Sequence, residues 1–282
     1  MASALRSAQI LPMRSAIGAF LAATLVAACA GGERPLRIGT TYTVEQSGAL
    51  ALLDSLHPPT QPAVVVGPSG QILAAAARGD LDIVVTHAPS LEARLLVDPG
   101  HARLRCPFVA SAFAVLGPAA DPAGVAGAGS AADAFLRIAR RRAPFVSRGD
   151  SSGTHVKELA LWRAAGVDPR GAPWYLESGA DQTTAIHLAE ERGGYALADL
   201  PTAARLPDLT LRVLFSHDTA LVNRYTLYVL HVSPPHAAAD TFAAWALGPW
   251  RARLTALRLP DGSPAFQPAT GGCATPTPAV SP

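Results

Sequence analysis

Residues 147–155 read SRGDSSGTH, and these residue types could support two different kinds of chemistry. Residues 149–153 match the pattern G-x-S-x-G, which surrounds the nucleophilic serine of α/β-hydrolases and would make Ser151 the nucleophile. The same stretch also offers an arginine, small hydroxyls and a glycine entering a helix, which together suit a bound anion. This second interpretation assigns an anion to Arg148, Ser152, Gly153 and Thr154.

The hydrolase interpretation lacks its sequence context. A nucleophile elbow needs a strand running directly into the first glycine, an earlier oxyanion loop, and an Asp and then a His later in the chain. Here Ser147 and Arg148 precede Gly149, and no His-Gly-Gly loop comes before them. The eight histidines show no spacing typical of a base or a catalytic metal site, and His87 is expected to cap or pack a loop. We therefore expect a binding protein rather than an enzyme, with no catalytic residue, cofactor or metal site.

Two earlier loops carry similar donors, and each follows a β-rich run. Hydroxyl residues follow the run at 36–39, and Pro68-Ser69-Gly70 follows the run at 63–67. In open α/β sheets, ligands bind beyond the carboxyl ends of strands, where helix N-termini offer unpaired N–H groups. Three such loops predict one shared site, because an interaction module without a small ligand would not need them. The expected anion ligands are Thr40, Thr41, Thr43, Ser69, Arg148, Ser152, Gly153 and Thr154.

Short apolar runs alternate with stretches of helical spacing from residue 35 to about residue 250. This alternation predicts an α/β fold with mostly parallel sheets and flanking helices. A β-rich run at 113–116 leads into a Gly/Ala/Pro-rich link that begins near residue 117. A stretch of helical spacing follows at 131–141, and a long β-rich run at 222–232 returns late in the chain. This order of runs along the chain favours two lobes hinged by two crossover strands, with a single doubly wound sheet as the alternative. The predicted parts are a first lobe (35–116 and 221–258) and a second lobe (117–220).

The N-terminus has the features of a secretory leader. Arg6 and Arg14 carry the only charges in residues 1–28, and an apolar run at 17–28 is too short for a permanent span. Val26-Ala27-Ala28-Cys29 resembles a bacterial lipobox, so residues 1–28 are expected to be removed and Cys29 lipidated before a linker at 29–34. An ordinary signal peptide containing a cysteine is the alternative, and translation could start at Met1 or Met13.

Charge gives no sign of a nucleic-acid partner. The full chain has 23 basic and 21 acidic side chains, and loss of the leader would leave 21 of each. The largest basic cluster is the triplet Arg140-Arg141-Arg142, which is expected to solvate a helix end. Nucleic-acid binding is therefore not expected.

The remaining cysteines and the C-terminal tail leave one question open. Residues 259–282 are rich in proline and poor in apolar side chains, a composition typical of disorder. Cys106 and Cys273 could pair in an oxidising compartment, but Cys273 lies in this tail and sequence gives no distances. Both a disulfide and two free thiols remain compatible with the sequence.

A family resemblance extends across most of the chain, from Ile38 to about Trp245. The run APFVSRGDSSGTHVKELALWRAAGVDP followed by WYLESG, with GDLDIVVTHAP, GPAADPAG, GYALAD and LFSHDTALVNRY, resembles the tungstate-binding components of bacterial ABC transporters. The resemblance implies the type II periplasmic-binding-protein fold, carrying a PBP-like domain. It also implies a protein that passes tungstate to a permease and its ATPase subunit. Together with the lipobox, it leads us to expect a monomer in the periplasm or at the cell surface, held at the membrane by the lipid on Cys29.

The resemblance also bears on the ligand. In the family's first loop, Thr40 and Thr41 match threonines, Thr43 replaces a serine, and Tyr42 and Val44 replace threonines. The first two loops contain donors only, which suits a fully deprotonated dianion such as tungstate, molybdate or sulfate better than phosphate. Donor chemistry does not distinguish these three dianions, and the resemblance indicates tungstate, with molybdate next.

Overall fold

The computed structural model describes residues 34–277, and the residues expected to form a leader (1–28) and Cys29 lie outside this range. The described residues form two lobes, each with its own hydrophobic core clusters. We call residues 34–112 and 222–277 the first lobe, and residues 113–221 the second lobe. Within the described part of the chain, no helix has the length and apolar character that a membrane crossing requires.

The first lobe is built on strands that alternate with helices. Ile83–Thr86 is buried along its whole length, as expected for a strand covered on both faces. Strands β2, β1 and β3 are parallel neighbours, and β9, β4 (Ala102–Gly117) and β10 continue the sheet in antiparallel pairings. The early elements are β1 (Arg37–Thr41), α1 (Tyr42–Gln46), α2 (Ala49–Ser55), β2 (Ala63–Gly67), α3 (Ser69–Ala77), β3 (Ile83–Thr86), α4 (Pro89–Glu92) and a π-helical turn (Ala93–Val97). The late elements are β9 (Val222–Leu230), α9 (Ala239–Trp245), a π-helical turn (Ala246–Trp250), α10 (Arg251–Ala256) and β10 (Gln267–Pro268).

The second lobe holds its helices around a smaller set of strands. Strands β5 and β6 are parallel, whereas β7 and β8 pair antiparallel with the end of β4. Helices α5, α6 and α7 each begin at a Ser or Asp whose side chain accepts a backbone N–H of the first turn. The elements are a 3₁₀ turn (Val125–Gly127), α5 (Ala131–Arg141), β5 (Phe145–Ser147), α6 (Gly153–Ala164), β6 (Tyr175–Glu177), α7 (Gln182–Glu191), β7 (Ala196–Asp199), α8 (Leu200–Ala203), β8 (Arg212–Phe215) and a second 3₁₀ turn (Thr219–Leu221).

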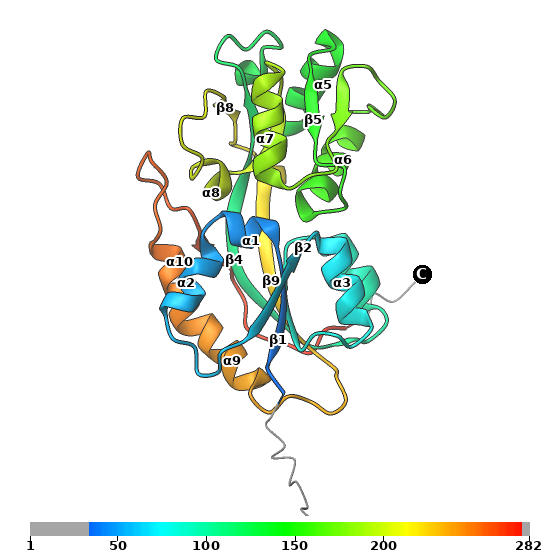
Figure 1. The fold of residues 1–282 in the computed structure, drawn as a ribbon. Helices are drawn as coiled ribbons and strands as arrows, with labels where there is room; N and C mark the ends of the chain where they lie inside the picture. The colour runs from blue at the N-terminus through cyan, green and yellow to red at the C-terminus, as the bar shows by residue number, and fades with distance from the viewer. Residues whose placement is uncertain (1–33, 278–282) are drawn as a thin grey trace, which may run out of the picture. The chain divides into compact units, whose positions relative to one another are not determined.

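Two long strands run between the lobes, as predicted (Figure 1). The first part of β4 (Ala102–Gly117) pairs with β9 from Leu230 back to Val222, and its last part, from Phe113, pairs with β7. Only residues 113–116 of β4 were expected from sequence. The earlier half was missed because Pro107 interrupts the pattern, and the structure accommodates this proline at a shift of register between Pro107 and Val109.

The expectation of a disordered tail is wrong for residues 259–277. Phe266 is 2% exposed in the first-lobe core, and β10 pairs with Val109 and Ala110 of β4. Cys273 forms a disulfide with Cys106, which answers the open question about these thiols. Composition predicted disorder because it averages over the whole segment. One buried aromatic ring and one disulfide are nevertheless enough to fix the segment against the first lobe. Residues 278–282 lie outside the described range.

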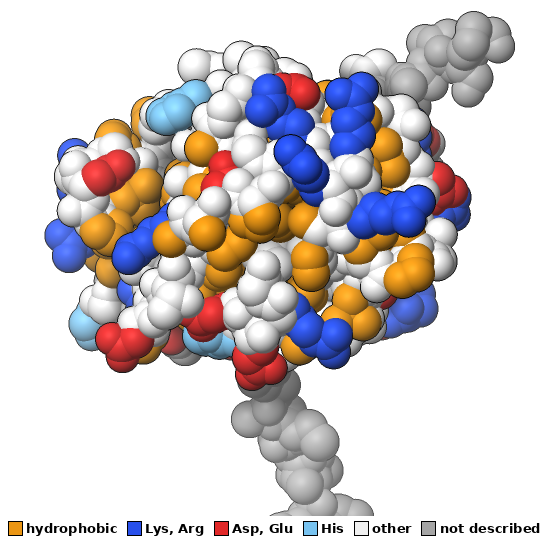
Figure 2. Space-filling model, turned by 90° about the horizontal axis from the view of Figure 1, so that it is seen from above, with side chains coloured by type: hydrophobic (Ala, Val, Ile, Leu, Met, Phe, Trp, Pro, Cys, Tyr) orange, Lys and Arg blue, Asp and Glu red, His pale blue; other side chains and the backbone are white. Residues whose placement is uncertain are grey.

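The second-lobe end of the molecule, seen from above, has a mixed surface (Figure 2). Lys and Arg side chains are distributed over this face, with apolar side chains exposed between them.

Candidate functional site

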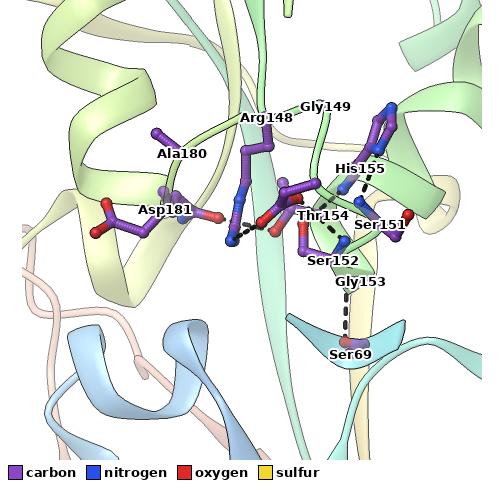
Figure 3. A network of polar contacts seen from close by, with 12 residues as sticks. Ser69, Arg148, Gly149, Ser151, Ser152, Gly153, Thr154, His155, Ala180 and Asp181 are labelled. Carbon is purple, nitrogen blue, oxygen red and sulfur yellow. Dashed lines mark hydrogen bonds and ion pairs between the residues drawn. The ribbon is translucent and has the colours of Figure 1, made fainter. Parts of the chain in front are cut away.

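Four strand-to-helix connections bring the candidate site together. Strand β1 leads directly into α1, β2 leads into α3, β5 leads through residues 148–152 into α6, and β6 leads through residues 178–181 into α7. The first two connections belong to the first lobe and the others to the second. Figure 3 shows the loop from Arg148 to Thr154 and Asp181 above Ser69, which comes from the first lobe.

The three threonines of the first connection have different partners. The Thr40 hydroxyl donates to the Val85 carbonyl at 3.1 Å, so its single proton is committed inside the β-sheet. In contrast, the hydroxyl oxygens of Thr41 and Thr43 are buried, and neither has a hydrogen-bond partner among the described residues. The sequence hypothesis treated all three alike, but only Thr41 and Thr43 have a hydroxyl donor left for a ligand.

Arg148 is the charged group of the site. Its side chain is 2% exposed, and its Nη2 donates to Asp150 Oδ2 at 2.5 Å. Its Nε and Nη1 are buried without a partner in the described part of the chain. Burial lowers the pKa of Arg148, an effect that Asp150 opposes, but an arginine pKa starts so high that the guanidinium stays charged at neutral pH. Two donors of a buried cation are therefore available to an anion.

The loop after Arg148 is held by its own side chains. The second Asp150 oxygen, Oδ1, accepts the Ser152 amide at 3.1 Å, and Ser152 Oγ caps α6 by accepting the His155 amide at 3.2 Å. Both oxygens of Asp150 are thus used within the loop. The Thr154 hydroxyl donates to Gln182 Oε1 at 2.8 Å. The Thr154 amide is the second in α6, where no intrahelical acceptor exists for it.

Three hydrogen bonds join the lobes around this loop. The Gly153 amide donates to Ser69 Oγ at 3.1 Å, and the Gly70 amide donates to the Ser151 carbonyl at 3.2 Å. The Thr183 amide donates to Gln46 Oε1 at 3.4 Å. The lobes therefore meet directly, and the unpartnered donors lie in buried surroundings rather than in an open cleft.

A pocket of about 490 Å³ marks the entrance between the lobes. Its lining comes from both of them: Tyr42, Pro68, Gln71, Asp150, Gly179, Ala180, Asp181 and Thr184. A larger pocket of about 630 Å³ lies elsewhere on the second lobe, between exposed Arg142 and Arg192, and is lined mainly by apolar residues. The buried donors belong to neither lining, and they, rather than pocket size, define the candidate site.

His87 packs against the start of α6, which extends its expected packing role. A Cβ on Gly153 would lie 2.6 Å from His87 Cε1, so only glycine permits this approach. Asn223 Nδ2 donates to Asp199 and Tyr225, and its Oδ1 therefore accepts from His87 Nδ1 at 2.9 Å. Burial lowers the pKa of His87 to about 3, so the ring is neutral at physiological pH. No local pattern in the sequence predicts this contact between His87 of the first lobe and Gly153 of the second.

Gln182 is a site residue that sequence reasoning missed. It opens α7 directly after the N-cap Asp181, it is fully buried, and its Nε2 has no partner among residues 34–277. The sequence did contain a pattern that could have identified this loop. Residues 178–184 follow a β-rich run and open a helix at an Asp N-cap, as the other binding loops do with their own caps.

The geometry does not provide a serine hydrolase. Ser151 has the positive φ of 59° that a nucleophile elbow shares, but no hydrogen bond within residues 34–277 joins its hydroxyl to a histidine. The nearby His155 instead uses Nδ1 to accept the Ser151 amide at 3.2 Å. The same residues contain no cluster of three or more His, Cys, Asp or Glu side chains able to hold a metal ion. The arrangement instead provides buried hydrogen-bond donors held in fixed positions by the two lobes.

The fold and the site define a class of two-lobed α/β proteins that enclose a polar ligand. The chain belongs to the family of the PBP superfamily domain, whose model matches residues 29–249. It is similar to the tungstate-binding protein TupA of Peptoclostridium acidaminophilum, with 31% identity over 225 residues covering 74% of this chain and 76% of that protein.

Two solved structures are similar over most of the chain. The tungstate ABC transporter structure from Geobacter sulfurreducens has 36% identity and a TM-score of 0.68, covering 77% of this chain and 96% of that one. TupA from Desulfovibrio alaskensis G20 has 30% identity and the same TM-score of 0.68, covering 84% of this chain and 99% of that one. These relatives are transport and binding proteins, which confirms the predicted fold and the prediction of a binding protein rather than an enzyme.

Proposed function

We propose that this protein captures a tetrahedral oxyanion between its lobes, with tungstate as the ligand and molybdate next. It then delivers the anion to a membrane permease that an ATPase subunit powers. The relatives named for tungstate support the choice of ligand. The observation that carries the proposal is the set of buried, unpartnered donors: Thr41 Oγ1, Thr43 Oγ1, Arg148 Nε, Arg148 Nη1 and Gln182 Nε2.

The energetics of burial explain why these donors favour a bound anion. A buried polar group without a hydrogen bond costs about 1–3 kcal/mol, and more if it is charged. Several such groups in one region would be a large penalty for a protein whose total stability is only about 5–15 kcal/mol. A bound oxyanion supplies the acceptors that satisfy them together. Donors come from both lobes, so the ligand stabilises the closed arrangement more than an open one.

The acceptors of the site argue for a fully deprotonated dianion. Phosphate carries at least one proton near neutral pH, and a carboxylate acceptor would help to bind that protonated form. Both oxygens of Asp150 already accept hydrogen bonds from Arg148 and Ser152. Tungstate, molybdate and sulfate all need donors only, so cavity size decides among them, and phosphate is the least suited.

Binding of an anion panel tests the proposal. The purified chain beginning at residue 30 is titrated by calorimetry and thermal shift with tungstate, molybdate, sulfate and phosphate. Tungstate at ~100 times its dissociation constant should add roughly 2.7 kcal/mol to the free energy of unfolding. If none of the four anions binds, or if phosphate binds most tightly, the proposed ligand class is wrong.

The cellular setting is part of the same proposal. The N-terminal sequence supports export and lipidation at Cys29, which lies outside the described residues, and a monomer acting in the periplasm or at the cell surface. A lipoprotein anchor holds firmly because it has several chains, whereas one acyl chain binds reversibly. Cys29→Ser should release the protein from the membrane fraction while leaving anion binding intact. A variant that still partitions into detergent like the parent would contradict the anchor.

A further inference from the structure

Gln182 holds the most completely buried amide of the candidate site. The side chain is 0% exposed at the first residue of α7, and its Oε1 accepts a hydrogen bond from the Thr154 hydroxyl at 2.8 Å. Its Nε2 carries two protons and has no partner among the described residues. A buried amide nitrogen is costly to leave unpaired, so this atom requires an acceptor from outside the chain.

Neighbouring groups connect this amide to the anion site. Thr154 occupies the second position of α6, in the same loop-and-helix segment as Arg148. Asp181, the residue directly before Gln182, interacts electrostatically with Arg148. Thr183, the residue directly after it, is bonded to Gln46 of the first lobe. The residues on either side of Gln182 thus interact with Arg148 and with the first lobe.

The hydrogen bond between Thr154 and Gln182 changes the role of Thr154. A threonine hydroxyl has one proton, and here that proton goes to Gln182 Oε1. Reversing the amide would leave Oε1 as the unpaired atom, and a carbonyl oxygen facing a dianion would be repelled. The orientation with Nε2 unpaired is therefore the one compatible with an anion, and it leaves Thr154 without a hydroxyl donor for the ligand.

We propose that Gln182 is a specificity-determining residue of this site, whose Nε2 donates to the bound oxyanion, and that Thr154 is its positioning residue. This inference rests on the proposed function. A neutral amide adds a donor without adding charge, so Arg148 remains the one full positive charge assigned to the ligand. An amide N–H bonds more strongly to a deprotonated oxygen than to the oxygen of a P–OH group, and it offers no acceptor for the P–OH proton.

Two substitutions of Gln182 test the donor directly. Gln182→Met keeps a similar volume without a donor, and Gln182→Glu replaces the donor with an acceptor. We expect Gln182→Met to raise the tungstate dissociation constant roughly ten- to a hundredfold, the range of one lost bond to a charged group. Gln182→Glu should raise it further at pH 8, because a carboxylate repels the dianion. Gln61→Glu is the matched control, since Gln61 is exposed just before β2, at the end of that strand away from the site, and should leave affinity near-native.

A double-mutant cycle separates positioning from independent binding. If Thr154 acts through Gln182, then Thr154→Val together with Gln182→Met should bind as weakly as Gln182→Met alone, and Thr154→Ser should restore affinity. Additive losses would show that Thr154 donates to the anion itself and would overturn its positioning role. Thermal unfolding without ligand establishes that each variant is folded, and Gln182→Met provides the measurement if Gln182→Glu does not fold.

The outcomes distinguish this inference from the proposed function. Tungstate binding by the unmodified protein, lost in Arg148→Ala but near-native in Gln182→Met, would overturn the role of Gln182 and leave the proposed function standing. Absence of binding by the unmodified protein would overturn both. Weakened binding in Gln182→Met, with Gln61→Glu near-native, supports the inference.

Discussion

The Gly153 amide donates to Ser69 Oγ across the two lobes at 3.1 Å, and both residues are buried. Gly153 opens α6 in the second lobe and Ser69 opens α3 in the first, so two helix N-termini face each other through one hydrogen bond. Because Ser69 Oγ accepts this bond, its own proton is still available to a ligand. The pair therefore couples closure of the lobes to the place where the anion is proposed to bind.

Removing the Ser69 hydroxyl should weaken binding by loosening this closed contact. We expect Ser69→Ala to raise the tungstate dissociation constant roughly tenfold, mainly through faster release, because one buried hydrogen bond is worth about 0.5–1.5 kcal/mol. Stopped-flow fluorescence gives the release rate and calorimetry the affinity. Ser55→Ala is the control, since its hydroxyl bonds the Leu52 carbonyl on an exposed part of α2. Equal affinities for Ser69→Ala and the parent would contradict a role for the contact.

Loss of Arg148 should have a larger effect because it removes the cation. Arg148→Ala is expected to cost about 3 kcal/mol, roughly a hundredfold in dissociation constant, and Arg148→Lys should recover only part, because an ammonium lacks the planar fork. Calorimetric titration with tungstate measures both. Arg170→Ala is a matched control, because Arg170 pairs with Asp168 at the same spacing but is 72% exposed.

A purely structural role for Arg148 would give a different pattern of tungstate affinities among the variants. If Arg148 served only to hold Asp150, Asp150→Asn would weaken binding as much as Arg148→Ala does. Near-native tungstate affinity in Arg148→Ala would exclude Arg148 from the site.

The stability of the protein should depend on pH through Glu158. Burial raises the pKa of this carboxyl from 4.5 to about 7, although Tyr175 and Trp162 donate to it. Between these values the folded state binds more protons than the unfolded state, so the free energy of unfolding falls as pH rises through the window. The total fall is on the order of 3 kcal/mol. Urea unfolding at pH 5 and pH 8 should show this loss, and Glu158→Gln should reduce it. Identical pH dependence in both proteins would contradict the assignment.

The C-terminal tail should stabilise the first lobe through its disulfide. Cys106 and Cys273 are 167 residues apart in sequence, and a cross-link closing so long a loop restricts the unfolded chain strongly. Cys273→Ser should lower the free energy of unfolding by about 2–5 kcal/mol. A reductant should lower the melting temperature of the parent and leave that of the variant unchanged. A parent insensitive to reductant under unfolding conditions would argue against the bond.

The sequence by itself determined the order of elements and the places where ligands could bind. Alternation of β-branched runs with helical spacing predicted β2 and α5 with the bounds that the structure has, because those signals are local. Loops rich in hydroxyls after strands identified the connections at Thr41, Ser69 and Arg148 for the same reason. The resemblance in these loops also indicated the family.

Tertiary structure alone decided which of these polar atoms are available to a ligand. The hydroxyl of Thr40 is used by Val85 and that of Thr154 by Gln182, partners 45 and 28 residues away in sequence. Whether a donor is free depends on what folding brings within about 3 Å of it, and no local pattern records such distances. The order of the C-terminal tail could not be predicted for the same reason. The ring of Phe266 packs in a core formed by strands that are distant in sequence.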